Sequence, residues 1–399
     1  MRKAMSKIVF FCIPAQGHTN PTLGVVRELI SMGHQVWYYS YDLLKEKIES
    51  AGATFVSCDA YDTQQKLSPK DATKIGKNMA FSIKILVETT LALGDVVCGH
   101  MEQLKPDCIV ADSMAVWGKA IAVKLGIPFV CSTTTFAFNK YSARIMKQSL
   151  KDMLSMVLAM PKVNRQIRRL QENGYPFKNV LDIMQSDENT HTIVYTSPEF
   201  QPCADTFSEK YAFVGPSIRP SNSHVEKKKE ILVYMSMGTV NNDMLPLYNK
   251  CISAFKATDY QLILSVGSLV DIKRLGTLPE NISVYSQVDQ IAVLKKADVF
   301  ISHCGMNSVS ESLYFGVPLI MLPQPSDQGG VARRVAQLSA GIVVKKRPNA
   351  HALLHSVREL AGNPAYKNHA KALSAGFQKC AGAKGAAGKI LQVCQSRNP

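Results

Sequence analysis

The feature that most constrains the fold is a repeated alternation of short apolar runs with longer stretches of helical pattern. In the first half of the chain, the apolar runs occupy residues 8–13, 35–40, 54–56, 108–112 and 128–131. Continuous apolar runs of this length are typical of strands that are buried on both faces. Strands that alternate with helices form parallel, doubly wound sheets. The first half is therefore predicted to be a Rossmann-like α/β domain.

The first predicted helix, residues 20–30, follows the first strand after a loop at 15–19. Thr19 or Asn20 is expected to cap this helix, and Pro21 suits a position near its start. A further helix is predicted at 116–125. The loop, which contains His18, is thus placed at the carboxyl end of the first strand.

The second half repeats the pattern after a polar, basic stretch that lacks apolar periodicity. Its apolar runs occupy residues 231–235, 261–265, 282–285, 299–301, 318–321 and 342–344. We therefore predict an N-terminal Rossmann-like domain at 1–216, a linker at 217–229 and a C-terminal Rossmann-like domain at 230–375. A C-terminal helical segment at 376–399 is expected to pack back on the first domain. Because ligands bind at the carboxyl ends of such sheets, the two domains are expected to face a central cleft.

Residues 140–177 differ from the rest in being basic, helical and rich in methionine. The methionines are Met146, Met153, Met156 and Met160. Methionine at this spacing fills cores, but methionine-rich surfaces also adapt to varied ligands. A mobile lid or a wall of an acceptor pocket is therefore the alternative to core packing.

Composition excludes several classes of protein. No apolar run approaches the roughly 20 residues of a membrane-spanning helix, and residues 1–13 indicate a first strand, not a signal peptide. The ten cysteines show no Cys-x-x-Cys spacing, which favours a reduced, cytoplasmic setting without a disulfide framework or zinc site. A net charge of +15 is spread over scattered clusters such as 227–229 and 345–347, and no nucleic-acid motif accompanies them. Solvated basic faces are the expected explanation of this charge, and peripheral contact with a membrane is the alternative. We expect a monomer.

The stretch from Ser302 to Glu311 indicates a phosphate site. It joins an apolar strand to a helix, and a helix start presents free N–H groups and a positive dipole end. His303, Asn307 and Ser308 add side-chain donors, and Glu311 can accept two hydroxyl groups such as those of a ribose. The alternative is a tight strand–helix connection that Asn307 or Ser308 caps.

Two segments of the chain resemble the signatures of one family. Residues 302–311, with Gly316-Val317-Pro318 and residues 323–328, resemble the donor-binding signature of glycosyltransferase family 1. Residues 17–21 resemble the catalytic turn of the same family. The resemblance covers nearly the whole chain and is strongest to bacterial macrolide and flavonoid UDP-glucosyltransferases. It implies the GT-B fold, in which two Rossmann-like domains face a central cleft.

The resemblance also implies a reaction. A sugar, expected to be glucose, passes with inversion from a UDP-sugar to a hydroxyl group of a lipophilic small molecule, such as a macrolide, a flavonoid or another phenolic. The UDP-sugar is a co-substrate, and no cofactor is implied. No metal is implied either, since the chain lacks the Asp-x-Asp motif of metal-dependent glycosyltransferases.

His18 and Asp112 are the predicted catalytic residues. A hydroxyl group is a weak nucleophile, and a positioned base typically contributes about 10²–10⁴-fold to its reaction. His18 precedes a helix start, whose dipole disfavours the protonated ring. Asp112 ends another strand of the same domain and can orient the ring and stabilise its developing charge, the role an aspartate at this place has in the family. Without that context, a lone histidine after a strand is more often structural than catalytic.

The resemblance assigns the donor to a set of residues in the second half. They are Gly238, Thr239, Val288, Gln290, His303, Gly305, Met306, Asn307, Ser308, Glu311, Asp327 and Gln328. Asn307 and Ser308 would contact phosphate, Glu311 would hold the ribose, and Asp327 and Gln328 would bind sugar hydroxyls. His303, the turn after it and Thr239 would stabilise the leaving diphosphate.

One segment departs from the family pattern. Relatives carry an aromatic residue before Val-Pro-Gln, and its ring stacks on uracil. Here the segment is Gln287-Val288-Asp289-Gln290, so Gln287 replaces the aromatic residue and Asp289 replaces the proline. Stacking is worth about 1–3 kcal/mol per base in nucleic-acid sites. The recognition of the base is therefore where this chain is expected to differ.

Three other functions share this architecture. The acceptor could be a membrane lipid, which the basic balance favours. A non-hydrolysing nucleotide-sugar epimerase has the same fold but leaves the His18 and Asp112 pair unexplained. A nucleotide-sugar-binding protein without turnover is the alternative outside the enzymes. The segments expected to line the acceptor pocket, roughly 60–90 and 135–185, carry no pattern that identifies the acceptor.

Overall fold

The structure is a computed structural model that describes residues 5–61, 78–145, 150–183, 189–239, 242–324, 328–344 and 348–396. The chain divides into two compact units, each described here by itself. The first comprises Met1–Ser217 and Ala381–Pro399, and the second comprises Ile218–Cys380. The predicted linker, from residue 218 onward, thus belongs to the second unit. After the second unit, the chain re-enters the first unit at Ala381.

The first unit contains a sheet of seven parallel strands in the order β3-β2-β1-β4-β5-β6-β7. The strands are β1 (Lys7–Phe11), β2 (Gln35–Ser40), β3 (Thr54–Ser57), β4 (Cys108–Asp112), β5 (Phe129–Thr133), β6 (His191–Val194) and β7 (Tyr211–Phe213). The prediction of a parallel, doubly wound sheet is confirmed. The strand β6 was not predicted, because its four residues are too few to show a period and two of them are polar.

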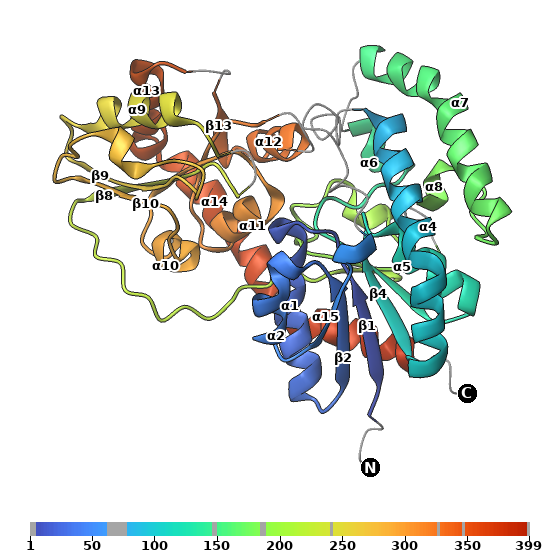
Figure 1. Cartoon of the computed structure of the whole chain (residues 1–399). Helices are drawn as coiled ribbons and strands as arrows, with labels where there is room; N and C mark the ends of the chain where they lie inside the picture. Colours follow the sequence, from blue (N-terminus) through green and yellow to red (C-terminus); the bar gives the residue numbers. More distant parts are fainter. Residues whose placement is uncertain are drawn as a thin grey trace. The chain divides into compact units, whose positions relative to one another are not determined.

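Helices cover both faces of this sheet (Figure 1). The helices of this unit are α1 (Gln16–Ser31), α2 (Lys45–Glu49), α4 (Met79–Leu104), α5 (Val116–Leu125), α6 (Lys140–Ile145), α7 (Leu150–Glu172), α8 (Val180–Ile183) and α15 (Gly382–Gln395), of which α7, in its described residues, packs against α4 and not against the sheet. Side chains alternate along β1, so Ile8 and Phe10 pack in one core with α1 and α15. Val9 and Phe11 pack in a second core with α4 and α5. The central strands are therefore buried on both faces, as their apolar runs predict.

The start of α1 differs from the prediction. The helix begins at Gln16, and Pro21 lies inside it. The prediction of a loop at 15–19 was wrong because proline near the first helical position is a preference, not a rule. The N–H groups of His18 and Thr19 both donate to the Ala15 carbonyl at 3.0 Å, and these bonds form the first turn. His18 is thus part of the helix and not of a preceding loop.

The second unit contains a sheet of six parallel strands in the order β10-β9-β8-β11-β12-β13. The strands are β8 (Ile231–Ser236), β9 (Tyr260–Ser265), β10 (Ile282–Tyr285), β11 (Val299–Ser302), β12 (Leu319–Met321) and β13 (Gly341–Val343). The helices are α9 (Leu245–Phe255), α10 (Gln290–Leu294), α11 (Met306–Tyr314), α12 (Gln328–Gln337), α13 (Ala350–Gly362) and α14 (Pro364–Lys379). Val233 and Met235 of β8 pack in a core with α9 and α13. The second Rossmann-like sheet is also confirmed.

The C-terminal helical segment is broken between α14 and α15. Gly382 has a φ of 57°, a left-handed conformation that glycine adopts readily, and its N–H donates to the Val214 carbonyl at 2.7 Å. Ala386, Ala387 and Ile390 of α15 are then buried in the core that α1 and β1 share. The last helix is therefore an integral part of the first unit.

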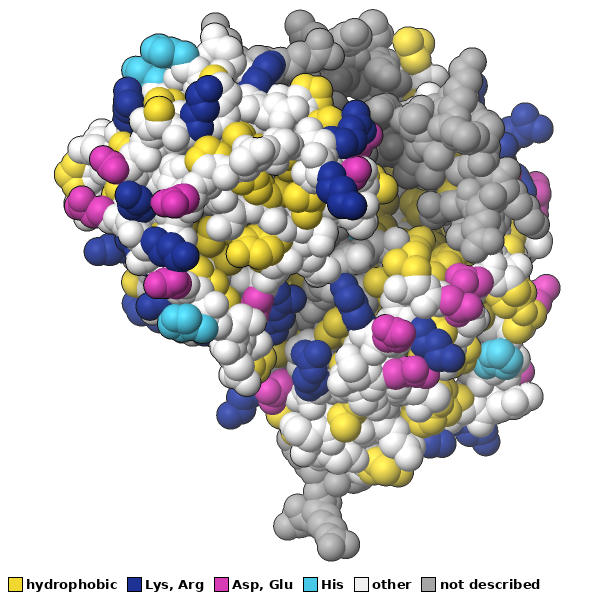
Figure 2. Space-filling model, turned by 60° about the vertical axis from the view of Figure 1, so that its left-hand side comes forward, with side chains coloured by type: hydrophobic (Ala, Val, Ile, Leu, Met, Phe, Trp, Pro, Cys, Tyr) yellow, Lys and Arg dark blue, Asp and Glu magenta, His cyan; other side chains and the backbone are white. Residues whose placement is uncertain are grey.

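The charged side chains of the described residues do not gather in one patch on the face that Figure 2 shows. Lysine and arginine side chains are interspersed there with acidic and hydrophobic ones. Among the described residues, no helix is long and apolar enough to cross a membrane. In the methionine-rich segment, Met160 packs against a core of the first unit. Met146 lies outside the described residues.

Candidate active site

In each sheet, the strand order reverses between two central strands. The reversal lies between β1 and β4 in the first unit and between β8 and β11 in the second. Open α/β sheets bind ligands outside the carboxyl ends of their strands at such a reversal. In the first unit, His18 follows β1 and Asp112 is the last residue of β4. In the second unit, the segment 236–239 starts at the last residue of β8, and the segment 302–308 starts at the last residue of β11. The topology therefore places the predicted residues at the two points where a ligand site is expected.

In the first unit, His18 and Asp112 are in direct contact. Nδ1 of His18 lies 2.7 Å from Oδ2 of Asp112. The Asp112 side chain is 1% exposed and that of His18 is 22% exposed. A buried carboxylate thus meets a ring that solvent or a ligand can still reach.

The Asp112 carboxylate is fixed through its other oxygen, since the backbone N–H of Met114 donates to Oδ1 at 2.9 Å. Thr134 is also part of the cluster, with Oγ1 3.2 Å from Nδ1 of His18. Thr134 was not predicted, although it follows the carboxyl end of β5, the strand next to β4. The rule that places residues at the carboxyl ends of parallel strands would have found it.

This geometry determines which ring nitrogen is available for chemistry. If the proton of the neutral ring is on Nδ1, that nitrogen donates to the Asp112 carboxylate, and Nε2 carries the lone pair. Nε2 can then accept a proton from a hydroxyl group. The charge that the ring acquires is stabilised by the carboxylate 2.7 Å away. The pair can therefore act as a general base with an orienting carboxylate.

In the second unit, the imidazole of His303 lies between two glycines. A Cβ atom built on Gly238 would lie 2.6 Å from Nε2 of His303, and one built on Gly305 would also lie 2.6 Å from that atom. Gly238 has in addition a φ of 84°, in the left-handed region. Both glycines are therefore needed for the ring to reach this position.

We expect Gly238→Ala to weaken the binding of UDP about tenfold or more. The new methyl group must displace the His303 ring, and losing one hydrogen bond to a charged phosphate costs about 1.5–3 kcal/mol. Titration calorimetry with UDP measures the effect. Gly33→Ala is the matched control, because Gly33 has a φ of 87° but no atom within 4 Å of the Cβ position. It adds the backbone strain alone and should leave UDP binding unchanged. An unchanged affinity in Gly238→Ala would show that the ring position is unimportant.

The turn after His303 leads directly into α11. Gly305 is the N-cap residue and Met306 is the first residue of the helix, so Asn307 and Ser308 lie in its first turn. The alternative in which Asn307 or Ser308 caps the helix is wrong. Helix starts leave N–H groups without intrahelical partners, and these groups favour an anion. The prediction of a helix-start anion site agrees with this geometry.

Gln290 connects the helices α10 and α11. Its Nε2 donates to Oε2 of Glu311 at 2.6 Å and lies 3.4 Å from Oγ of Ser308, while its Oε1 accepts from the hydroxyl of Tyr234 at 3.2 Å. Burial raises the pKa of the Glu311 carboxyl, and the hydrogen bond from Gln290 opposes that rise. Gln290 therefore fixes the carboxylate that was predicted to hold a ribose.

The structure gives a local reason for Asp289, which replaces the family's proline. Asp289 is the N-cap residue of α10, and its Oδ1 accepts the N–H of Ile291 at 3.2 Å. Aspartate is one of the preferred N-cap residues. The substitution thus keeps the start of α10, and with it the position of Gln290, without a proline.

The other predicted donor residues are distributed around these contacts. Thr239 is exposed in the turn after β8, and Val288 is half-buried before α10. Gln328 is the first residue of α12, and its Oε1 accepts the N–H of Gln324 at 3.0 Å. Asp327 lies outside the described residues. A buried residue that was not predicted, Asn242, donates from Nδ2 to the Gly238 carbonyl at 3.0 Å and supports that turn.

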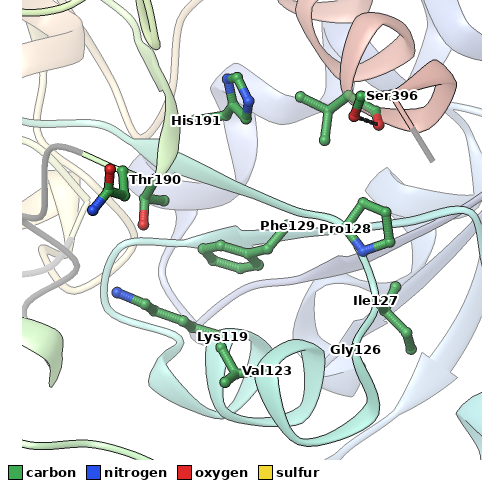
Figure 3. A pocket seen from close by; sticks show the side chains of 11 residues that line it. Lys119, Val123, Gly126, Ile127, Pro128, Phe129, Thr190, His191 and Ser396 are labelled. Atoms are coloured by element: carbon green, nitrogen blue, oxygen red, sulfur yellow. Dashed lines mark hydrogen bonds between the residues drawn. The ribbon is translucent and has the colours of Figure 1, made fainter. Parts of the chain in front are cut away.

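A surface pocket of about 450 Å³ lies elsewhere in the first unit (Figure 3). Phe129 and His191, which begin β5 and β6, help to line it together with Lys119 and the end of α15. It is therefore at the amino ends of the strands, and none of the predicted site residues lines it. Among the described residues, no group of three or more His, Cys, Asp or Glu side chains could hold a metal ion.

The chain is similar to known proteins both over part of its second unit and over nearly its full length. Residues 250–380 match the family model of the erythromycin biosynthesis protein CIII-like C-terminal domain. The chain is 32% identical to the uncharacterized UDP-glucosyltransferase YojK of Bacillus subtilis (strain 168), over 98% of both chains. It is 31% identical to the NDP-glycosyltransferase YjiC of Bacillus licheniformis, over 96% of both chains. The crystal structure of the glycotransferase of kitacinnamycin superimposes with a TM-score of 0.83 at 26% identity, over 98% of this chain and 99% of the other.

The likenesses to the two relatives and to the solved structure extend over nearly the full length of the chain and include both sheets. The predicted GT-B fold, with its two Rossmann-like domains, is confirmed by the solved structure. The chain belongs to the family 1 glycosyltransferases.

Proposed function

We propose that the protein transfers glucose from UDP-glucose, with inversion at the sugar's anomeric carbon, to a hydroxyl group of a lipophilic small molecule. The single observation that carries the proposal is the 2.7 Å contact between His18 and the buried Asp112. A binding protein has no need of a base that is held in this way. Relatives named as a UDP-glucosyltransferase and an NDP-glycosyltransferase support the donor class.

In the proposed reaction, Nε2 of His18 takes the proton of the acceptor hydroxyl while the acceptor oxygen attacks the anomeric carbon. The bond from that carbon to the diphosphate oxygen breaks, and UDP leaves with the electron pair. Asp112 stabilises the imidazolium that forms. The N–H groups at the start of α11 and the ring of His303 would receive the charge on the diphosphate. We propose that these groups stabilise the leaving group and that the reaction needs neither a metal nor another cofactor.

The acceptor class is supported by names alone. The matched family model is named for erythromycin biosynthesis, and the solved relative is called the glycotransferase of kitacinnamycin. We propose a macrolide, a flavonoid or another phenolic as the acceptor, the classes that the resemblance of the sequence implies.

Mass spectrometry of products tests the whole proposal. The purified protein is incubated with a matrix of UDP- and TDP-sugars against phenolic and macrolide acceptors. We expect a hexosylated product with UDP-glucose, and we expect an excess of EDTA to leave its yield unchanged. NMR of the product should show the β-glucoside expected for inversion of the α-linked donor. UDP-glucose binding without transfer to any acceptor would instead favour a non-catalytic binding protein.

A further inference from the structure

Arg219 forms an ion pair beside the predicted donor site. Its Nη2 lies 3.1 Å from Oδ1 of Asp289, so the pair joins residues 70 positions apart in the sequence. Arg219 lies at the start of the second unit, in a stretch without regular structure. Its side chain is 52% exposed and that of Asp289 is 24% exposed. One side of the guanidinium group is therefore held by the protein while another remains accessible.

The carboxylate that holds Arg219 is itself fixed. The Oδ1 atom of Asp289 accepts the N–H of Ile291 and so caps α10. The next residue, Gln290, donates to Glu311 at 2.6 Å. The residue that pairs with Arg219 is thus the sequence neighbour of the residue that binds Glu311, whose carboxylate is predicted to hold the ribose. Its positive charge also opposes the rise that burial causes in the pKa of Glu311.

The same segment lacks the aromatic ring that would contact the base. Gln287, the residue in that position, is exposed and offers no π surface. A guanidinium group is planar, is weakly hydrated and stacks on bases and aromatic faces. The segment therefore lacks a flat surface at Gln287, while Arg219 offers one beside it, and Asp289 supplies the carboxylate that orients the guanidinium group.

We propose that Arg219 is a specificity-determining residue of the donor site, and that Asp289 holds its guanidinium plane against the nucleotide base. The proposal rests on the proposed function, because a base is present only if the donor is a nucleotide sugar. Two other uses of the residue make different predictions. A surface ion pair without a ligand contributes little to stability and nothing to binding. A cation that pairs with the diphosphate would affect UDP but not uridine.

Titration calorimetry of UDP, with uridine measured by displacement of UDP, separates these cases. The variants are Arg219→Lys, which keeps the charge but loses the plane, and Arg219→Gln, which loses both. Stacking on a base is worth about 1–3 kcal/mol, a factor of about 5–150 in affinity. We expect both variants to weaken UDP and uridine by the same factor within this range. Asp289→Asn keeps a good N-cap residue but loses the ion pair, and a smaller loss is expected.

Lys227→Gln is the matched control. Lys227 pairs with Asp298 at 2.7 Å in the same unit, but Asp298 precedes β11 and so lies at the amino end of the sheet. This variant should leave both affinities unchanged, and thermal unfolding confirms that each variant is folded. Unchanged binding in both Arg219 variants would overturn the inference, as would a loss confined to UDP that lysine restores. Those two outcomes would leave the proposed function intact. Failure of the wild-type protein to bind UDP would overturn the proposed function as well as this inference.

Discussion

Replacement of His18 by alanine is expected to reduce sugar transfer by about 10²–10⁴-fold, the contribution of a positioned general base. The His18 side chain lies at the strand reversal of the first unit, contacts a buried carboxylate and is 22% exposed. Its removal leaves the acceptor hydroxyl with water as the only base. The measurement is the initial rate of product formation at saturating UDP-sugar.

The His18→Ala variant should still bind UDP with nearly wild-type affinity, because the predicted phosphate and ribose contacts are all in the second unit. That result separates loss of chemistry from loss of the donor. Transfer at the wild-type rate would rule out the assignment of His18 as the base. A parallel loss of UDP binding would show that the variant is misfolded or that the ring contacts the donor.

Asp112→Asn is expected to be comparably severe, with a loss of up to about 10⁴-fold, the effect of the same exchange in a Ser-His-Asp triad. Asparagine has the shape of aspartate, so the packing of this buried position is kept. Its amide can donate to Nδ1 of His18, which would then move the ring proton to Nε2. A ring protonated on Nε2 cannot accept the proton of the acceptor. The variant would also lack the negative charge that stabilises the imidazolium.

Asp107→Asn provides the control for this exchange. Asp107 precedes the same strand, and its Oδ2 accepts the backbone N–H of Lys7 at 2.8 Å. Like Asp112, Asp107 accepts a hydrogen bond from a backbone N–H, but it lies at the opposite end of β4. We expect its amide variant to retain transfer within about twofold, since this part-buried hydrogen bond contributes about 0.5–1.5 kcal/mol to stability and lies far from the reaction. Equal losses in both variants would point to folding and not to catalysis.

The fold could be predicted from the sequence because its central strands are buried on both faces. Cys108–Asp112, in which all five residues are buried, was placed at its observed bounds, since a largely apolar run of this length in an alternating α/β pattern is typical of a buried strand. The short strand His191–Val194 shows no such run, and it is held by the pairing of Val130 with His191 and of Cys131 with Thr192. Its existence depends on a neighbour that is distant in sequence.

The candidate site was predictable in its positions but not in its contacts. The carboxyl ends of adjacent parallel strands meet at one edge, so His18 and Asp112 could be paired from topology. The place of His303 between Gly238 and Gly305, and the ion pair of Arg219 with Asp289, depend on backbone conformations that sequence pattern does not specify. The departures at Gln287 and Asp289 were visible in the sequence. The residue that accompanies them, Arg219, became visible only when the chain was folded.

The return of the last helix to the first unit has a consequence for biosynthesis. Ala386, Ala387 and Ile390 complete a core whose other members, such as Ile8 and Val26, are translated before the whole of the second unit. Domains generally fold as units in the order of their synthesis. Here the core that α1 and β1 share must wait for its last helix until the second unit has been translated. The unit that carries the proposed catalytic base is therefore begun before the second unit and completed after it.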